Sequence, residues 1–262
     1  MVLRMLSAGL FVAVGAMPAL PANAAGVCLS MPLVFETGSV EGCPTGERIA
    51  ALMEAPLAAG PRDPDTGRAL GVELAAADQT GAPLRVRTCA AYVQAVEQGY
   101  AAMTQVAMSA EGFMRVACGT LLSLAASGEA SVSRFAEEGV GLETLGLLPP
   151  DILPALAPDT EEVLAALAAE GFTVGTMVGT GEVMTRPGRE GQLDLAYAGV
   201  ASTYGEVARG DFDGDGAEDL LVFAQHGAVE GSLRWYELFA LGYPGDAVIY
   251  HLFSPRGFAP LE

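Results

Sequence analysis

The spacing of apolar residues predicts helices in the first half of the chain. Over 88–124, apolar residues recur every three or four positions, which is the period of an amphipathic helix. Thr88 and Ser109 can each cap the start of such a run, so we expect two helices packed as an antiparallel pair. A shorter helix is expected over 47–57, where Pro56 ends it. Side chains at these spacings are expected to form helix core, without a chemical role.

The pattern changes to apolar–polar alternation in the second half, after a proline-rich connector over 145–158. Asp159 begins one further expected helix, with Glu162 as its capping-box partner and Gly171 as its end. Alternation then predicts strands over 172–178, 182–185, 192–198, 206–208, 220–224, 233–241 and 247–253. Helices followed by strands indicate an α+β fold, with a helical N-terminal half followed by an antiparallel β-sheet.

The first residues have the pattern of a secretory signal. Arg4 precedes an uncharged apolar run over 5–17, and the small residues over 22–25 provide a cleavage site. We expect cleavage after Ala24, which places the mature protein in the periplasm or outside the cell. The apolar run is shorter than the roughly 20 residues that a helix needs to cross a bilayer. Since no comparable run follows, stable membrane insertion is not expected.

The remaining chain is expected to form two regions, a disulfide-stapled helical region over 25–150 and a β-rich region over 151–262.

A lipid anchor on Cys28 is an alternative to simple export. However, Val27 stands immediately before that cysteine, where lipoprotein cleavage generally requires a smaller residue. Cleavage after Ala24 is therefore favoured.

Four cysteines follow the expected leader, and an even number in an exported chain indicates two disulfides. Three pairings are possible. The two local pairs are favoured because each closes a short or moderate loop and stabilises the fold by about 3 to 4 kcal/mol. Zinc is the alternative, but no two cysteines form a C-x-x-C pair and both histidines lie far away in sequence. The favoured pairs are Cys28 with Cys43 and Cys89 with Cys118.

Composition excludes several function classes. The formal charge is −19, and every one of the 13 basic residues is arginine, so the chain can form neither a lysine Schiff base nor a Walker phosphate loop. Removing the leader removes Arg4, so 32 acidic residues would face 12 basic residues, a formal charge of −20. An acidic surface repels nucleic acid and anionic lipid. Cationic partners, above all a divalent metal ion, are favoured.

One motif carries specific chemistry. The ten residues from Gly210 to Asp219 read G-D-F-D-G-D-G-A-E-D, with carboxylates at positions 1, 3, 5 and 9 counted from Asp211. Ca²⁺ takes about six to eight oxygen ligands, which alternating aspartates around a tight turn can supply. Gly216 permits the turn, and the carbonyl group of Ala217 provides an uncharged oxygen. Four negative charges this close repel one another unless a cation binds.

An EF-hand would have a glutamate at position 12, where this chain has Val222 in an apolar run. The motif is therefore typical of a strand-loop-strand calcium site. Over about residues 208–224, the string G-D-F-D-G-D-G-A-E-D-L-L-V-F resembles the FG-GAP and VCBS repeat family. That family usually has tandem copies in a β-propeller, whereas a single copy is present here, so no propeller is inferred. The resemblance implies calcium bound by Asp211, Asp213, Asp215, Ala217 and Asp219.

Catalytic patterns are weaker. The sequence has no G-x-S-x-G, H-E-x-x-H or glycine-rich dinucleotide motif, and His226 and His251 each stand alone. Trp235 and Tyr236, beside Arg234, fit either core packing or a sugar or peptide platform. We therefore expect an exported, non-enzymatic protein with one structural calcium ion and a protein- or envelope-interaction role, its partner an envelope protein or glycan. The alternative is a periplasmic hydrolase acting on cell-envelope material near one of the histidines.

Overall fold

The computed structural model describes residues 27–76, 81–133, 135, 139–188, 191–242, 249–254 and 257–260. The leader expected over 1–24 therefore lies outside the described residues. The helices, together with two short 3₁₀ segments labelled η, are α1 (Gly46–Met53), α2 (Cys89–Glu97), α3 (Gln105–Ala126), η1 (Leu142–Gly146), η2 (Pro150–Ile152), α4 (Pro158–Ala169) and α5 (Val174–Thr180). The strands are β1 (Cys28–Phe35), β2 (Gly38–Gly42), β3 (Val72–Ala76), β4 (Leu84–Val86), β5 (Tyr100–Ala101), β6 (Met184–Pro187), β7 (Gln192–Tyr197), β8 (Val200–Gly210), β9 (Asp219–Ala228), β10 (Arg234–Gly242), β11 (Ile249–Ser254) and β12 (Gly257–Pro260).

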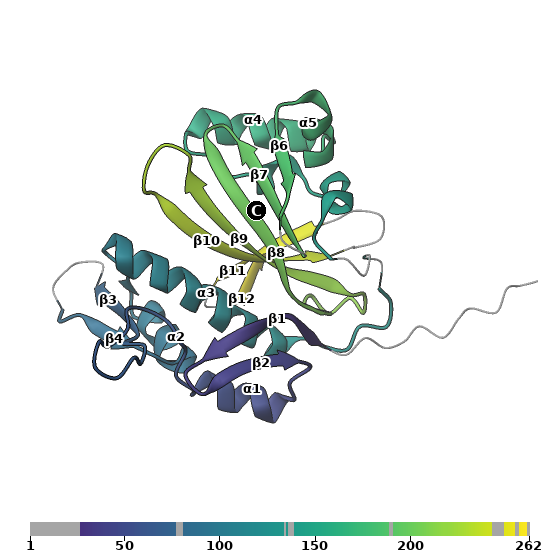
Figure 1. Cartoon of the computed structure of the whole chain (residues 1–262). Helices are drawn as coiled ribbons and strands as arrows, with labels where there is room; N and C mark the ends of the chain where they lie inside the picture. Colours follow the sequence, from purple (N-terminus) through teal and green to yellow (C-terminus); the bar gives the residue numbers. More distant parts are fainter. Residues whose placement is uncertain are drawn as a thin grey trace, which may run out of the picture.

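The main sheet is antiparallel and has β8 at its branching point (Figure 1). Its strands follow the order β12-β11-β10-β9-β8-β1-β2, and β7 also pairs with β8 and carries β6. A bulge between Glu206 and Ala208 divides β8, so that β7 pairs with the part before it and β1 with the part after it. A small second sheet has the order β4-β3-β5.

The predicted helical N-terminal half followed by a β-sheet is wrong, and the fold is mixed α+β throughout. The strands β1 and β2 join the same sheet as β8, and α4 and α5 follow in the second half. The predicted strand over 172–178 is largely α5. There, the Thr173 side chain accepts a hydrogen bond from the Thr176 amide at 3.2 Å, and Gly181 ends the helix at a φ of 82°. Capping at both ends outweighs the alternating pattern.

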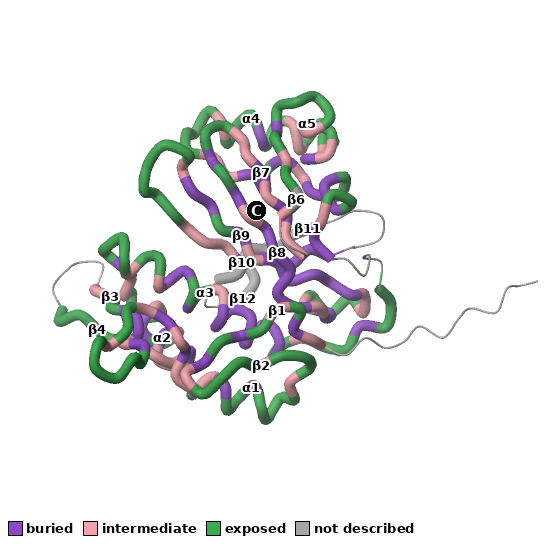
Figure 2. The backbone as a smooth tube through the Cα atoms, viewed as in Figure 1, coloured by how far each residue is buried: buried purple, intermediate pink, exposed green. Residues whose placement is uncertain are grey.

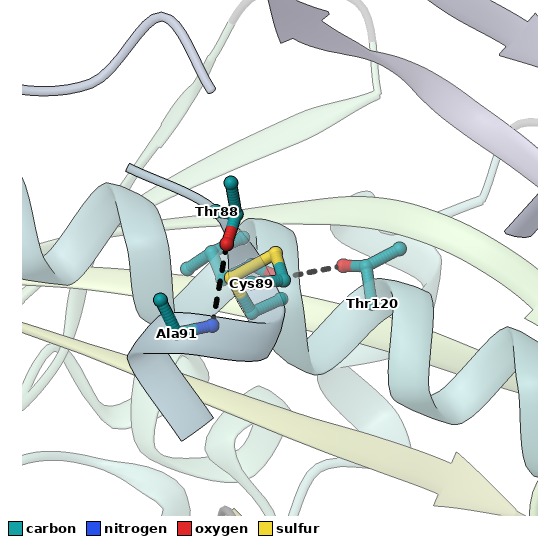
Figure 3. Close-up of a disulfide and its surroundings, with 6 residues drawn as sticks. Thr88, Cys89, Ala91 and Thr120 are labelled. Atoms are coloured by element: carbon teal, nitrogen blue, oxygen red, sulfur yellow. Dashed lines mark hydrogen bonds between the residues drawn. A yellow bond between two sulfur atoms is a disulfide. The ribbon is translucent and has the colours of Figure 1, made fainter. Parts of the chain in front are cut away.

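Three capped helix starts were predicted, and only the cap at Thr88 is confirmed. The helix α4 forms, but its cap position is Ala157, which provides no side-chain hydrogen bond, so the predicted capping box of Asp159 and Glu162 is wrong. The Thr88 hydroxyl caps α2 by accepting a hydrogen bond from the amide of Ala91 (Figure 3). The helix α3 does not begin after Ser109, because Thr104 caps it one turn earlier. Since both residues precede the same apolar pattern, the pattern alone did not distinguish them.

Two disulfides hold the first half together, in the pairing that the sequence favours. Cys28 is bonded to Cys43 across the β1–β2 hairpin, and Cys89 is bonded to Cys118 between α2 and α3 (Figure 3). Cysteines paired in this way are typical of proteins in oxidising compartments. Within the described residues, no single helix has the length and hydropathy needed to cross a bilayer. Only α4 and α5 taken together have that length and hydropathy, and they are bent by 106° relative to each other.

The main sheet separates two hydrophobic cores. Because side chains alternate along a strand, Leu220 and Leu221 lie on opposite faces, and each belongs to a different core. The first core lies under α1, α2 and α3 and includes Leu57, Val72, Tyr92, Met114, Leu121, Leu221, Leu238 and Ala240. The second core lies under η1, η2, α4 and α5 and includes Leu148, Leu164, Val174, Met177, Leu193, Tyr204, Leu220, Val222 and Phe239. The buried central strands between them are visible in Figure 2.

Close packing between α3 and β10 requires a glycine. A Cβ atom on Gly112 would lie 1.9 Å from Cδ2 of Tyr236, which is far inside van der Waals contact. We expect Gly112→Ala to lower the free energy of unfolding by about 1 to 3 kcal/mol, measured by urea denaturation, because the helix must shift away from the ring. The control is Gly179→Ala in α5, where nothing lies within 4 Å of the added methyl group. An equal effect of the two substitutions would contradict this packing.

Candidate metal centre

The predicted loop connects the two longest strands of the main sheet. The ladder between β8 and β9 ends at the pair Gly210 and Asp219, and the loop occupies the residues between them. Gly214 and Gly216 have φ angles of 85° and 83°, in the left-handed region that glycine adopts without strain. These two turns help the chain to reverse direction between β8 and β9.

Three of the four predicted carboxylates form a cluster. Ligand oxygens of Asp211, Asp213 and Asp215 lie within 4.8 Å of one another, and they make a group that could hold a metal ion. Asp211 is buried, whereas the other two are exposed. Charges at this spacing repel, most strongly near the buried carboxylate, where water screens them least.

Backbone amides of the loop orient these side chains. The two carboxylate oxygens of Asp211 accept hydrogen bonds from the amides of Gly214 at 2.7 Å and Gly216 at 3.0 Å. Oδ1 of Asp213 accepts one from the amide of Asp215 at 3.0 Å. Asp215 in turn accepts from the amide of Ala217 at 2.7 Å. The amides offset part of the negative charge and set the direction of each carboxylate.

The fourth predicted carboxylate, Asp219, lies outside the group of three but is the most buried of the set. Only 1% of its surface is exposed. Oδ2 accepts a hydrogen bond from the amide of Phe212 at 2.8 Å, whereas Oδ1 is buried and has no hydrogen-bond partner among the described residues. Burial, with a smaller contribution from the charges of Asp213 and Asp215, raises the pKa of Asp219 to about 7. A buried carboxylate oxygen without a hydrogen-bond partner costs free energy, which a bound cation or a proton would reduce.

Gly242 at the end of β10 leaves space for this unpartnered oxygen. A Cβ atom on Gly242 would lie 2.5 Å from Oδ1 of Asp219 and 3.6 Å from Oδ2 of Asp213. The two oxygens therefore face the same space beside the glycine. Oδ2 of Asp213 belongs to the cluster, and Oδ1 of Asp219 belongs to the buried carboxylate beside the cluster. All four aspartates offer hard oxygen donors. Such a donor set suits a hard cation.

The fifth predicted ligand is the backbone carbonyl group of Ala217. This residue lies in the loop, donates its amide to Asp215, and forms a bridge with Val132. The structure thus brings Asp211, Asp213 and Asp215 together, places Asp219 beside them, and attaches Ala217 to a distant segment.

Sequence reasoning gave no role to the polar network beside the loop. The Arg209 guanidinium donates to both carboxylate oxygens of Glu206, at 2.7 and 3.0 Å, and lies 3.5 Å from a carboxylate oxygen of Glu218. Hydrogen bonds with Glu206, more than any other influence, raise the pKa of Arg209. The hydroxyl of Ser30 donates to Glu206, and that of Ser133 donates to Glu218. Together these contacts fix the loop to the sheet, but nothing in the local sequence indicates them.

The histidines and the aromatic pair do not join this centre. His226 is fully buried, with Nδ1 2.9 Å from the Ser202 hydroxyl oxygen, Nε2 3.5 Å from a Glu237 carboxylate oxygen, and Trp235 stacked at 5.0 Å. Neighbouring Tyr236 lies against α3 on the opposite face, so the two aromatic rings do not form one platform. The side chain of the other histidine, at position 251, lies outside the described residues.

No protein family, curated protein or solved structure matches this chain. The similarity to the FG-GAP and VCBS repeat therefore depends on the residues of the loop alone.

The raised pKa of Asp219 predicts an unusual pH dependence in the calcium-free protein. The folded state holds a proton on this carboxyl where the unfolded chain has released it, so the free energy of unfolding falls as the pH rises from about 4 to about 7. Asp219→Asn removes the titrating group, and its curve should lack this part of the decline. The measurement is urea denaturation of both proteins in chelator across that range. Parallel curves would show that Asp219 titrates normally.

A second prediction concerns the space beside Gly242. Gly242→Ala should displace the carboxylate of Asp219 and lower the free energy of unfolding by about 1 to 3 kcal/mol, since the clash involves a buried charged group. It should also reduce any stabilisation of the protein by calcium, measured by thermal melting. Gly46→Ala serves as the control because nothing lies within 4 Å of its added methyl group. If Gly242→Ala behaves like the wild type, the absence of a side chain at Gly242 is not needed to hold the Asp219 carboxylate in place.

Proposed function

We propose that this chain is an exported, non-enzymatic protein in which one calcium ion orders the loop between β8 and β9. One observation carries the proposal. A buried carboxylate oxygen of Asp219 has no hydrogen-bond partner in the part of the chain that the structure describes. Together with Oδ2 of Asp213, it faces the space beside Gly242. A divalent cation there would neutralise the buried charge and the repulsion within the adjacent cluster of aspartates.

Calcium fits this loop better than the common alternatives. Zn²⁺ in proteins is usually bound by cysteine and histidine, and both disulfide pairs and the buried His226 are committed elsewhere. Mg²⁺ requires near-ideal octahedral geometry and retains several waters, whereas Ca²⁺ accepts a larger and less regular set of oxygens. Alternating aspartates and backbone carbonyls around a glycine turn provide such a set.

Export is supported by the two disulfides and by the leader expected before residue 25. Periplasmic or secreted proteins meet higher calcium concentrations than cytosolic ones, and extracellular calcium modules function with dissociation constants of about 10⁻⁴ to 10⁻³ M. A modest affinity would therefore be sufficient here.

An interaction role with an envelope protein or glycan has support at the far end of the sheet. Two adjacent cavities of about 570 and 510 Å³ lie there, with Met184, Ala196 and Val229 among their shared lining residues. Met184 and Val229 are 66% and 63% exposed, and exposed apolar side chains that gather in one place are typical of binding surfaces. Neither cavity is lined by residues of the loop, so the ion would have a structural role.

The hydrolase alternative is less well supported. His226 and Ser202 are among the residues around the larger cavity, but the His226 side chain has no exposed surface. Its ring nitrogens face Ser202 and Glu237, and strand alternation places it with Tyr204 on the face of the second core. A catalytic histidine must reach a substrate. We therefore favour the binding protein.

The proposed calcium site predicts thermal stabilisation. Calcium at 100 times its dissociation constant adds about 2.7 kcal/mol to the free energy of unfolding, or roughly 5 to 10 °C in the melting temperature of a chain this size. Asp213→Ala should abolish the shift. The control Asp65→Ala, an exposed aspartate in another loop, should retain it. An unchanged melting temperature of the wild type in saturating calcium would refute the proposal.

A further inference from the structure

A short segment after α3 lies along the loop and is bonded to it. We call this segment, residues 128–133, the strap. Gly128 exchanges backbone hydrogen bonds of 3.1 and 3.3 Å with Asp211 at the start of the loop. Ser131 donates its amide at 2.9 Å and its hydroxyl at 2.7 Å to the carbonyl oxygen of Gly216. The strap therefore contacts the loop at both its first aspartate and its second glycine turn.

Two further bonds attach the end of the strap to Glu218. The amide of Glu218 donates to the carbonyl oxygen of Val132 at 2.7 Å, and the hydroxyl of Ser133 donates to the Glu218 side chain. The same carboxylate faces Arg209 of β8. The strap is thus joined through Glu218 to the polar network that fixes the loop to the sheet.

Few apolar contacts hold the strap in place. Of its six residues only Ala130 is buried, at 1% exposure, and the other five are exposed. A segment with little buried apolar surface opens locally at a low free-energy cost unless its hydrogen bonds are maintained. The strap's hydrogen bonds described above all end on the loop, so its order depends on the order of the loop.

We propose that cation binding by the loop and docking of the strap are coupled. The inference rests on the proposed calcium site. Repulsion among Asp211, Asp213 and Asp215 favours a more open loop when no cation is bound. An open loop displaces the backbone groups of Asp211, Gly216 and Glu218 that hold the strap. Calcium closes the loop and thereby docks the strap.

The strap connects the two cores. It follows α3, which packs in the first core, and it precedes Phe135 and Val140, which belong to the second core. The ion bound at the loop would therefore control how firmly the connection between the two faces of the sheet is held.

Coupling of this kind is reciprocal. If calcium favours the docked strap by some factor, the docked strap raises the calcium affinity by the same factor. Ser131→Ala and Ser133→Ala each remove a side-chain hydrogen bond to the loop without removing a carboxylate. Loss of one such bond corresponds to an affinity about two- to tenfold weaker. Ser127→Ala is the matched control, since the Ser127 hydroxyl donates to Leu124 at the end of α3.

The test combines two measurements on the full disulfide-bonded chain. Isothermal titration with calcium chloride gives the affinities of the wild type and the three serine variants. Hydrogen exchange by mass spectrometry, with and without calcium, follows peptides that cover the strap and, as a reference, α2. We expect calcium to slow exchange in the strap at least about tenfold but not in α2, and Ser131→Ala and Ser133→Ala to bind calcium more weakly than Ser127→Ala.

The result separates this inference from the proposed function. If the wild type binds calcium, but strap exchange is unchanged and all three serine variants bind equally well, the coupling is overturned and the calcium site stands. If the wild type binds no calcium, both are overturned.

Discussion

The structure around the β8–β9 loop depends on the cost of placing several carboxylates close together at the end of a buried ladder. Asp211 and Asp219 stand where β8 ends and β9 begins, and both are buried. Backbone amides stabilise most of their oxygens, but Oδ1 of Asp219 has no partner among the described residues. A proton on Asp219 removes the negative charge of this buried carboxylate. A divalent cation would in addition reduce the repulsion from the exposed aspartates.

This electrostatic constraint acts on the whole fold because of where the loop lies. The strand β8 pairs with β9, β7 and β1, so one strand links both parts of the sheet. The loop follows this strand directly and touches the strap that connects the two cores. The loop contacts the sheet through Arg209, and it contacts the strap through Ser131 and Ser133. These are the contacts through which the proposed coupling would act.

Local chemistry in the sequence predicted the short-range features well. Thr88 as a helix cap and the two local disulfides depend on residues close together in the chain, and all were predicted correctly. The strong loop motif likewise predicted the clustering of Asp211, Asp213 and Asp215. In each case neighbouring residues largely determine the geometry.

Long-range features could not be predicted in this way. Pairing of β1 with β8 joins segments about 180 residues apart. The alternating pattern of a strand does not indicate which other strand it pairs with. Gly242 and Arg209 have roles only because β10 and the bulged β8 bring them to the loop. The helix α5 was mistaken for a strand because its apolar residues suit both structures, and the Thr173 cap decided between them.

The most direct test of this account is a crystal structure of the protein grown with calcium, with the ion identified by anomalous scattering. The account predicts one ion at the loop, with oxygens of Asp211, Asp213, Asp215 and Asp219 at about 2.3 to 2.6 Å from it. An ordered loop whose carboxylates diverge, with no ion between them at saturating calcium, would contradict it.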